Sequence, residues 1–280
     1  MKNPFDQQYL DVMQRILDKG IRRSNRTGVD TIGLPSSMLV MDLADGFPLL
    51  TTKRIAFKTM AVELEGFIKG VTDKRWFQER GCHIWDEWCS PLKVPYGNDA
   101  ESKAAMASEA DLGPIYGAQW RGFGGRDQLA AILADLSASP DSRRMVCSAW
   151  NPPEIPTMAL PPCHVLWQVL VLGGKLHLNW YQRSADWFLG VPFNMASYSL
   201  LAALLAAHAG LARGVVTGFF GDSHLYDNQI AAAREQLSRT EHFPAPDVNV
   251  PTASILDWSH DKVEVVGYQY HPSIKVPVVV

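Results

Sequence analysis

The chain has 280 residues, of which 47% are hydrophobic and 20% charged, the composition of an ordinary globular protein with one large domain or two small ones. Its net charge of −3 argues against a basic surface for duplex nucleic acid. The four cysteines are Cys82, Cys89, Cys147 and Cys163. They have neither metal-ligand spacing nor disulfide density, and the N-terminal residues carry no apolar signal core, so we expect a soluble, cytoplasmic protein.

The first predicted element is a helix over residues 8–19, which Gly20 ends. Its apolar stripe consists of Leu10, Met13, Ile16 and Leu17. A basic loop follows, in which Arg22 and Arg23 are interpreted as solvated. Arg26 lies between small polar residues whose backbone N–H groups could help to hold an anion, so it is a candidate phosphate ligand.

Residues 31–43 have the composition of a strand, which we expect to break at Pro35. A helix is predicted over 59–69, and Glu63 lies on it. This glutamate is either a surface residue or a partly buried acid with a raised pKa. Residues 90–110 are polar and alanine-rich without a strong period, which indicates an insertion or a small lobe.

The segment 111–121 is predicted to be a loop, and a helix is predicted over 127–136. A turn at 140–142 then presents Arg143 and Arg144. Two adjacent arginines in a turn are usually solvated, although a guanidinium group also suits a phosphate.

A β-hairpin over residues 165–182 is predicted from its Gly173-Gly174 turn. A strict two-residue loop places Cys163 opposite Ser184, whereas a bulge brings Arg183 beside it. In either register a guanidinium lies near the thiol and favours the reactive thiolate, so Cys163 is a candidate nucleophile. The alternative is a buried structural thiol.

His164 follows Cys163 directly, and neighbours in a strand point to opposite faces, so a simple cysteine–histidine dyad is not expected. The two side chains share a cavity only if Pro161-Pro162 twist the entry to the strand. A long, nearly apolar helix is predicted over 193–210 and is expected to be buried. Asn194 at its start suits a pyrimidine edge, or equally serves as an N-cap.

The motifs PPCH, YQRSAD and FLGVPFNMASY, in this order and spacing, resemble the core of the thymidylate synthase family. NRTG, DGFPLLTTKR, IWDEW, DLGPIYGAQWR, PDSRR, SAWNP, GDSHLYDNQ and HPSIKVPVVV extend the match over nearly the whole chain. The resemblance implies a single domain over 1–280 with a small-lobe insertion around 90–110. It implies an α/β (α+β) fold, in which helices pack on a large mixed sheet and one sheet face forms the two-fold interface of a homodimer.

The implied activity is the methylation of dUMP to dTMP, with 5,10-methylenetetrahydrofolate as donor of the one-carbon unit and the hydride. The implied catalytic residues are Cys163, Glu63, Tyr116, His164, Arg183, Asp186 and Asn194. The implied contacts with dUMP are Arg26, Arg143, Arg144, Gln182, Arg183, Ser184, Asp186, Asn194, His224 and Tyr226. Those with the folate are Trp85, Trp88, Asp186, Leu189, Gly190, Phe193 and Val279. No metal, membrane or nucleic acid is implied.

Some implied roles are more specific. Arg143 and Arg144 would cross the two-fold axis to the phosphate in the partner's site. Asn194 would select uracil over cytosine, and His224 and Tyr226 would bind the 3′-hydroxyl of the deoxyribose. The terminal valines would close over the loaded site and exclude water.

The sequence departs from the family pattern at Ala56, Glu65-Gly66, Val71 and Asp73. These departures keep a sister reaction open, in which water replaces hydride and 5-hydroxymethyl-dUMP leaves. A third alternative is a non-catalytic nucleotide- or RNA-binding homologue. The presence of Cys163 and of all the candidate arginines argues against that alternative.

Overall fold

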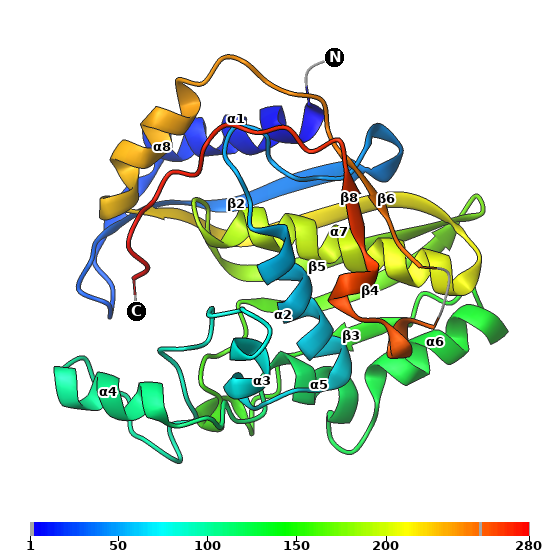
Figure 1. Cartoon of the computed structure of the whole chain (residues 1–280), viewed down its shortest axis with the longest axis horizontal. Coiled ribbons are helices and arrows are strands. Elements are labelled where there is room, and N and C mark those ends of the chain that lie inside the picture. Colours follow the sequence, from blue (N-terminus) through cyan, green and yellow to red (C-terminus); the bar gives the residue numbers. More distant parts are fainter. Residues whose placement is uncertain (1–2, 252–253, 280) are drawn as a thin grey trace.

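The computed structural model describes residues 3–251 and 254–279 (Figure 1). Its centre is a six-stranded mixed sheet with the order β1-β2-β6-β5-β4-β3. The strands are β1 (Ile21–Arg23), β2 (Thr31–Asp42), β3 (Val146–Ser148), β4 (His164–Leu172), β5 (Lys175–Asp186) and β6 (Ala212–Tyr226). β5 and β6 run parallel, and the other neighbours in this sheet run antiparallel. The expected mixed α/β fold with a large sheet is therefore confirmed.

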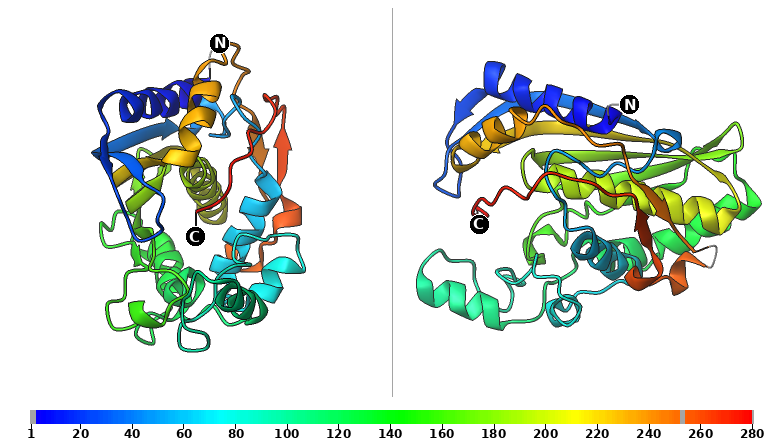
Figure 2. Two further views of the ribbon diagram at one scale, coloured as in Figure 1. Left: turned by 90° about the vertical axis from the view of Figure 1, so that its left-hand side faces the viewer. Right: turned by 45° about the horizontal axis from the view of Figure 1, so that its top comes forward.

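Helices pack in layers against this sheet. α7 (Gly190–Ala209) lies against β5 and β6, and α2 (Phe57–Lys69) lies against α7, while α1 (Pro4–Lys19) packs on β2. Figure 2 shows these layers from two further sides. The remaining elements are α3 (Lys74–Gln78), α4 (Ala100–Ser108), α5 (Tyr116–Gly122), α6 (Gln128–Ala138), α8 (Ile230–Leu237), and the antiparallel pair β7 (Asp247–Asn249) and β8 (Glu264–Val266).

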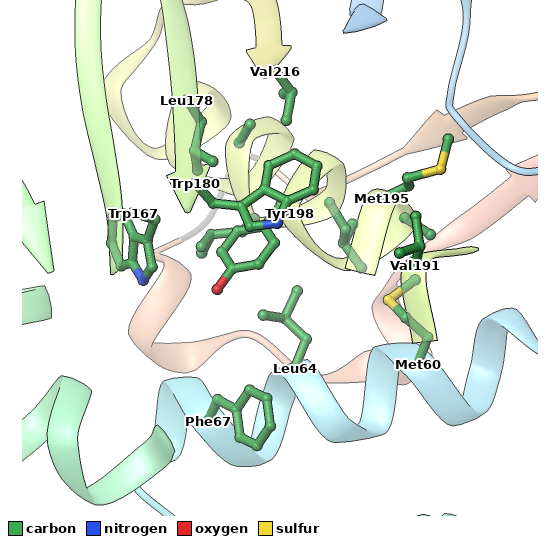
Figure 3. Packing of buried hydrophobic residues seen from close by; sticks show 14 of the residues in the cluster. Met60, Leu64, Phe67, Trp167, Leu178, Trp180, Val191, Met195, Tyr198 and Val216 are labelled. Carbon is green, nitrogen blue, oxygen red and sulfur yellow. The ribbon is translucent and has the colours of Figure 1, made fainter. Parts of the chain in front are cut away.

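The core lies between α2, α7 and the strands (Figure 3). Leu64 and Phe67 of α2 point toward Tyr198 of α7, and Tyr198 stacks on Trp180 of β5 with ring centroids 5.0 Å apart. Being covered on both sides, α7 is apolar nearly all round. Its length and composition would suffice to cross a membrane, but 72% of its most apolar window is buried inside the protein, as in a core helix.

The helices predicted over 8–19, 59–69 and 127–136 are confirmed, although their bounds differ: α1 begins at Pro4, α2 begins at Phe57, and α6 runs from Gln128 to Ala138. The loop predicted over 111–121 is wrong in its second half, because α5 begins at Tyr116. This short helix buries aromatic rings against Phe67 of α2, a contact between distant segments that outweighs the local turn signal. The segment 90–110, expected to be an insertion or small lobe, contains the helix α4, which has one buried side chain, that of Met106.

The break expected at Pro35 is also wrong, since β2 runs through it to Asp42. Ser36 has a φ of 64° and no partner in the register with β6, where the pairing passes from Pro35 to Ser37. The pairing keeps the same register on both sides of Ser36, so no residue is inserted. Pro35 lies past residues 31–33, where β1 pairs with β2, so it occupies an edge position, and edge strands tolerate proline. The proline therefore does not end the strand.

One face of the sheet carries a continuous row of exposed apolar side chains. In the strand register Met38 of β2 lies beside Phe219 of β6, which lies beside Tyr181 of β5 and then Leu166 of β4. Their exposed fractions lie between 36% and 54%. Large contiguous apolar patches on a protein surface commonly mark interaction sites.

Candidate active site

The ends of four neighbouring strands lie together at one end of the sheet and bring the candidate residues together. The parallel strands β5 and β6 both end there, so Asp186 lies beside His224. The antiparallel strands β4 and β2 begin there, so Cys163 precedes β4 and Thr31 of β2 pairs with Tyr226. Sequence segments more than a hundred residues apart therefore contribute to one site.

The register of the hairpin changes between His164 and Leu166, directly after Cys163 in the chain. Leu166 pairs with Tyr181, as a strict two-residue loop requires, but His164 pairs with Gln182 because a bulge intervenes. The backbone N–H of Arg183 then donates to the carbonyl oxygen of Cys163 at 2.9 Å. The bulged register is therefore confirmed, and the strict pairing of Cys163 with Ser184 is wrong. On the other side of β5, Ser184 lies beside Asp222 of β6.

Cys163 is half-buried, and burial raises the pKa of its thiol above the ordinary value. The positive charges of Arg183 and Arg26 act in the opposite direction without reversing this shift. The Arg183 guanidinium is held in place because it donates to the carbonyl oxygens of Pro162 and Pro161, at 2.8 and 2.9 Å. In a single chain the thiol form is thus favoured, and further positive charge would promote the thiolate.

Tyr116 connects Cys163 to His164. Its hydroxyl accepts a hydrogen bond from the backbone N–H of Cys163 at 2.8 Å, and its ring stacks on that of His164 with centroids 4.0 Å apart. His164 Nδ1 lies 2.8 Å from the hydroxyl oxygen of Tyr198. Burial lowers the pKa of His164 to about 3, so its imidazole is neutral at pH 7. The bulge disturbs the strand alternation here, and both residues adjoin Tyr116.

Glu63 on α2 faces the same aromatic cluster. Its Oε1 accepts a hydrogen bond from Trp85 Nε1 at 3.0 Å, and the Trp85 ring lies 6.3 Å from that of Tyr116. Burial raises the pKa of this carboxyl to about 7, although the Trp85 hydrogen bond opposes the shift. Of the two readings of Glu63, the partly buried acid is correct. A group that titrates near neutral pH suits proton transfer.

Asn194 does not cap its helix, because α7 begins at Gly190 rather than at 193, which places Asn194 in the second turn. Its Oδ1 accepts a hydrogen bond from Gln182 Nε2 at 3.0 Å. Gln182 is itself held by Trp180, whose Nε1 donates to Gln182 Oε1 at 3.3 Å. The amide of Asn194 is thereby oriented, so that its nitrogen is the donor it can offer to a ligand.

Asp186 connects the end of β5 to the start of α7. One carboxylate oxygen accepts from the backbone N–H groups of Phe188 and Leu189, both at 3.0 Å, and the other accepts from Gln229 Nε2 at 3.0 Å. His224 is buried beside it, and this burial lowers the pKa of the imidazole, although the Asp186 charge opposes the shift. Asp186 therefore has a structural role in its own turn, besides any contact with a ligand.

Arg143 and Arg144 lie away from the Cys163 of their own chain. They are exposed and precede β3, and the carbonyl oxygen of Arg143 accepts a hydrogen bond from Gln168 of β4 at 3.0 Å. Gln168 lies five residues along the strand from Cys163, about 16 Å at the usual rise. The structure thus brings together the other candidate residues of this edge, but not these two arginines.

The candidate folate residues lie in three places, which are the start of α7, the loop that contains Trp85 and Trp88, and the C-terminal segment. Trp85 and Trp88 are buried, whereas Leu189, Gly190 and Phe193 are half-buried next to the Asp186 turn. Val279 belongs to the C-terminal segment, where Asn228 Nδ2 donates to the carbonyl oxygen of Pro277 at 3.3 Å. An aromatic and apolar wall with one carboxylate acceptor fits a reduced folate ring. The tail has no strand over 276–279, and Val280 lies outside the described residues.

Lys53 is a site residue that the sequence interpretation missed. It is buried, and its Nζ donates to the carbonyl oxygen of Phe188, directly after the Asp186 turn. Burial lowers its pKa to about 7, while Asp186 opposes the shift. The sequence offered one signal for a buried lysine, since Lys53 follows a run of apolar and hydroxyl-bearing residues, FPLLTT. Among the described residues, no group of three His, Cys, Asp or Glu side chains is arranged to hold a metal ion.

A comparison with protein families identifies the family of the chain. The family described as thymidylate synthase, whose members carry out folate-dependent one-carbon transfer to a pyrimidine nucleotide, matches residues 7–280. This match covers essentially the whole chain and includes every strand end described above. The chain therefore belongs to the thymidylate synthase family.

Proposed function

We propose that the protein methylates dUMP to dTMP with 5,10-methylenetetrahydrofolate, as a cytoplasmic homodimer. The observation that carries the proposal is the position of Cys163, which lies beside Arg183 and directly against Tyr116, with the titratable Glu63 in the same aromatic cluster. A nucleophile, a cationic group and a carboxyl with a pKa of about 7 together support addition to a pyrimidine ring.

In this proposal the phosphate of dUMP binds Arg26 and Arg183 together with Arg143 and Arg144 of the second protomer. Burial disfavours the Cys163 thiolate in a lone chain, so the extra arginines supply the positive charge that it lacks. Arginine suits a phosphate dianion because its guanidinium donates two parallel hydrogen bonds.

The thiolate adds to C6 of the uracil, which makes C5 nucleophilic and places negative charge on the O4 carbonyl. The Asn194 amide donates to that edge of the base, while Glu63 and the neutral His164 exchange protons there through ordered water. The folate supplies the one-carbon unit and the hydride and leaves as dihydrofolate, and the C6–S bond breaks as the methyl group forms, which returns the Cys163 thiolate. Tyr116, adjacent to the Cys163 backbone, assists removal of the C5 proton.

Recognition of the deoxynucleotide uses the ends of β5 and β6. Gln182 and Ser184 line the base and the phosphate side, and His224 with Tyr226 binds the 3′-hydroxyl. Gln182 already donates to Asn194 Oδ1, so the group that Asn194 can offer to the base is its Nδ2 donor. This donor pairs with the O4 carbonyl of uracil and not with the exocyclic amine of cytosine. This orientation favours uracil over cytosine.

The exposed apolar row and the position of the two arginines support the homodimer. Met38, Phe219, Tyr181 and Leu166 would be covered by the same row of a second copy, as in an isologous interface. Arg143 and Arg144 are too far from their own Cys163 to bind the same nucleotide, so they would serve the neighbouring site.

The sister reaction, in which water gives 5-hydroxymethyl-dUMP, is less well supported. The changes at Glu65-Gly66 and in the Val71 turn keep it open. Glu65, however, bonds to Lys69 and His260, and Gly66 faces the ring of Phe77. The two helix residues thus make contacts of their own, which do not involve Glu63. The methylating reaction remains the better reading.

The test is to incubate the protein with dUMP and methylenetetrahydrofolate and to identify the products. Dihydrofolate with dTMP is expected; 5-hydroxymethyl-dUMP without dihydrofolate would favour the sister reaction, and binding without turnover a non-catalytic homologue. Cys163→Ser should abolish turnover yet keep dUMP binding, whereas Cys89→Ala should leave both in place. Normal turnover by Cys163→Ser would remove this thiol from the mechanism.

The shared site has its own test. We expect an inactive Cys163→Ser chain, mixed with an inactive Arg143→Ala/Arg144→Ala chain and allowed to exchange subunits, to regain activity. One site of the mixed dimer then combines an intact cysteine with intact arginines. No recovery in a mixture shown by native mass spectrometry to contain heterodimers would contradict the donation of these arginines.

A further inference from the structure

The inserted segment between Trp88 and Asp111 is firmly attached to the rest of the protein. Lys74 is buried, and its Nζ donates to three carbonyl oxygens, those of Asp86 at 2.9 Å, Trp88 at 3.0 Å and Met106 at 2.7 Å. Two of these belong to the tryptophan loop and the third to α4 of the insertion. The three N–H donors of the ammonium group therefore all have acceptors, and Lys74 fixes the insertion relative to the loop 84–88, which contains Trp85 and Trp88.

Tyr96 in this insertion contacts two candidate ligand-binding residues at once. Its ring stacks on Trp88, with ring centroids 6.3 Å apart and an angle of 16° between the planes. The guanidinium carbon of Arg26 lies 5.5 Å from the centre of the same ring, and Arg26 also donates to the Tyr96 hydroxyl at 3.4 Å. The hydroxyl in turn donates to Asn98 Oδ1 at 3.0 Å. Trp88, Tyr96 and Arg26 thus form a continuous line of contacts.

We propose that Tyr96 is a positioning residue that couples nucleotide binding at Arg26 to folate binding at Trp88. This inference rests on the proposed function, which assigns Arg26 to the dUMP phosphate and Trp88 to the folate. None of the motifs that carry the family resemblance includes Tyr96; it lies in the insertion, between IWDEW and DLGPIYGAQWR.

The physical reason is that Arg26 is exposed and has many rotamers, so binding a phosphate requires ordering its side chain. The Tyr96 ring attracts the guanidinium, and the stacked indole of Trp88 orients that ring. A phosphate that holds Arg26 therefore also holds Tyr96 against Trp88, and the folate meets a wall that is already ordered. Coupling of this kind is reciprocal, so folate should tighten dUMP binding by the same factor.

The experiment compares four variants with the unaltered protein. Tyr96→Ala removes the ring, Tyr96→Leu keeps bulk without a ring, and Tyr96→Phe keeps the ring without the hydroxyl. Leu92→Ala, in the same insertion and 73% exposed, is the matched control. Calorimetry gives the dissociation constant of tetrahydrofolate with and without dUMP, and the ratio of the two is the coupling factor.

We expect Tyr96→Ala and Tyr96→Leu to reduce the coupling factor about fivefold, the size of one exposed stack plus one cation–π contact. Tyr96→Phe and Leu92→Ala should keep most of it, and kcat with saturating substrates should change little. An unchanged factor in Tyr96→Ala, or an equal loss in Leu92→Ala, would overturn the role of Tyr96. The proposed function fails separately, if the unaltered protein forms neither dTMP nor dihydrofolate while the binding measurements still report on Tyr96.

Discussion

Glu63 and Glu65 lie two residues apart on α2, and their surroundings change their pKa values in opposite directions. Two residues correspond to about 200° around a helix, so the side chains leave on opposite sides. Glu63 faces Trp85 and the aromatic cluster beside Cys163, whereas Glu65 faces Lys69 and His260. One side of the helix serves the site and the other joins α2 to the 3₁₀ turn His260–Lys262.

The comparison shows that the partner of a buried carboxyl decides the direction of its pKa shift. Burial acts to raise both values, and for Glu63 one indole N–H is too little to reverse it. Glu65 is opposed by Lys69 and by the backbone N–H and ring nitrogen of His260, at 2.8 and 2.7 Å, and its pKa is lowered. Three substitutions on α2 test this contrast through four expected outcomes, which decrease in size.

Glu63→Gln is expected to lower kcat about a thousandfold, the usual weight of a general acid–base group. Glutamine still accepts the Trp85 hydrogen bond but transfers no proton. The pH dependence of kcat/KM in the unaltered protein should bend near pH 7, where this carboxyl titrates, and residual activity in the variant should lose that bend. A variant with near-normal turnover, checked for intact dUMP binding, would place the proton transfer elsewhere.

Glu65→Gln is expected to lower the free energy of unfolding by about 3 kcal/mol at pH 7, because it leaves Lys69 and His260 without their buried anion. The folded-state pKa of Glu65 is depressed, so its contribution is present above the ordinary value of 4.5 and is lost as the pH falls through the lowered folded-state pKa. Urea unfolding at pH 7 and pH 3.5 measures both. Glu79→Gln, 72% exposed and 3.6 Å from Arg80, is the control and should cost less than about 0.5 kcal/mol.

Glu63→Gln should also stabilise the protein at high pH, the opposite of its effect on activity. The folded-state pKa of Glu63 is raised, so ionisation opposes folding, and stability is lost as the pH rises from about 4.5 to about 7. The variant avoids this loss and should gain about 2 kcal/mol over the unaltered protein at pH 9. Thermal unfolding at pH 9 and pH 4 tests it, since no gain should appear at pH 4.

Gly66→Ala tests the other departure on α2. A Cβ at this position would lie 2.2 Å from a ring carbon of Phe77, which is fully buried and has little room to move. The expected cost is about 1 to 2 kcal/mol, typical of overpacking in a core. Gly122→Ala at the end of α5 meets nothing within 4 Å and should be neutral or slightly stabilising. Equal effects of the two substitutions would show that Phe77 is not the reason for Gly66.

The sequence interpretation succeeded where local physics decides. The Gly173-Gly174 turn has φ values of 59° and 74°, which only glycine adopts freely, so the hairpin could be predicted from two residues. The first helix could be predicted because its apolar stripe and Gly20 are local signals. The identity of the candidate site residues came from the order and spacing of whole motifs, since no single residue type distinguishes Cys163 from a core thiol.

The sequence by itself determined the family, the main elements and the residues to examine, because short-range patterns and motif order are written along the chain. Tertiary structure alone decided the bulge that puts Arg183 beside Cys163, the opposite surroundings of Glu63 and Glu65, and the line from Trp88 through Tyr96 to Arg26. Each of these depends on contacts between distant segments. Burial and partner charge act through space, so residue spacing carries no record of them.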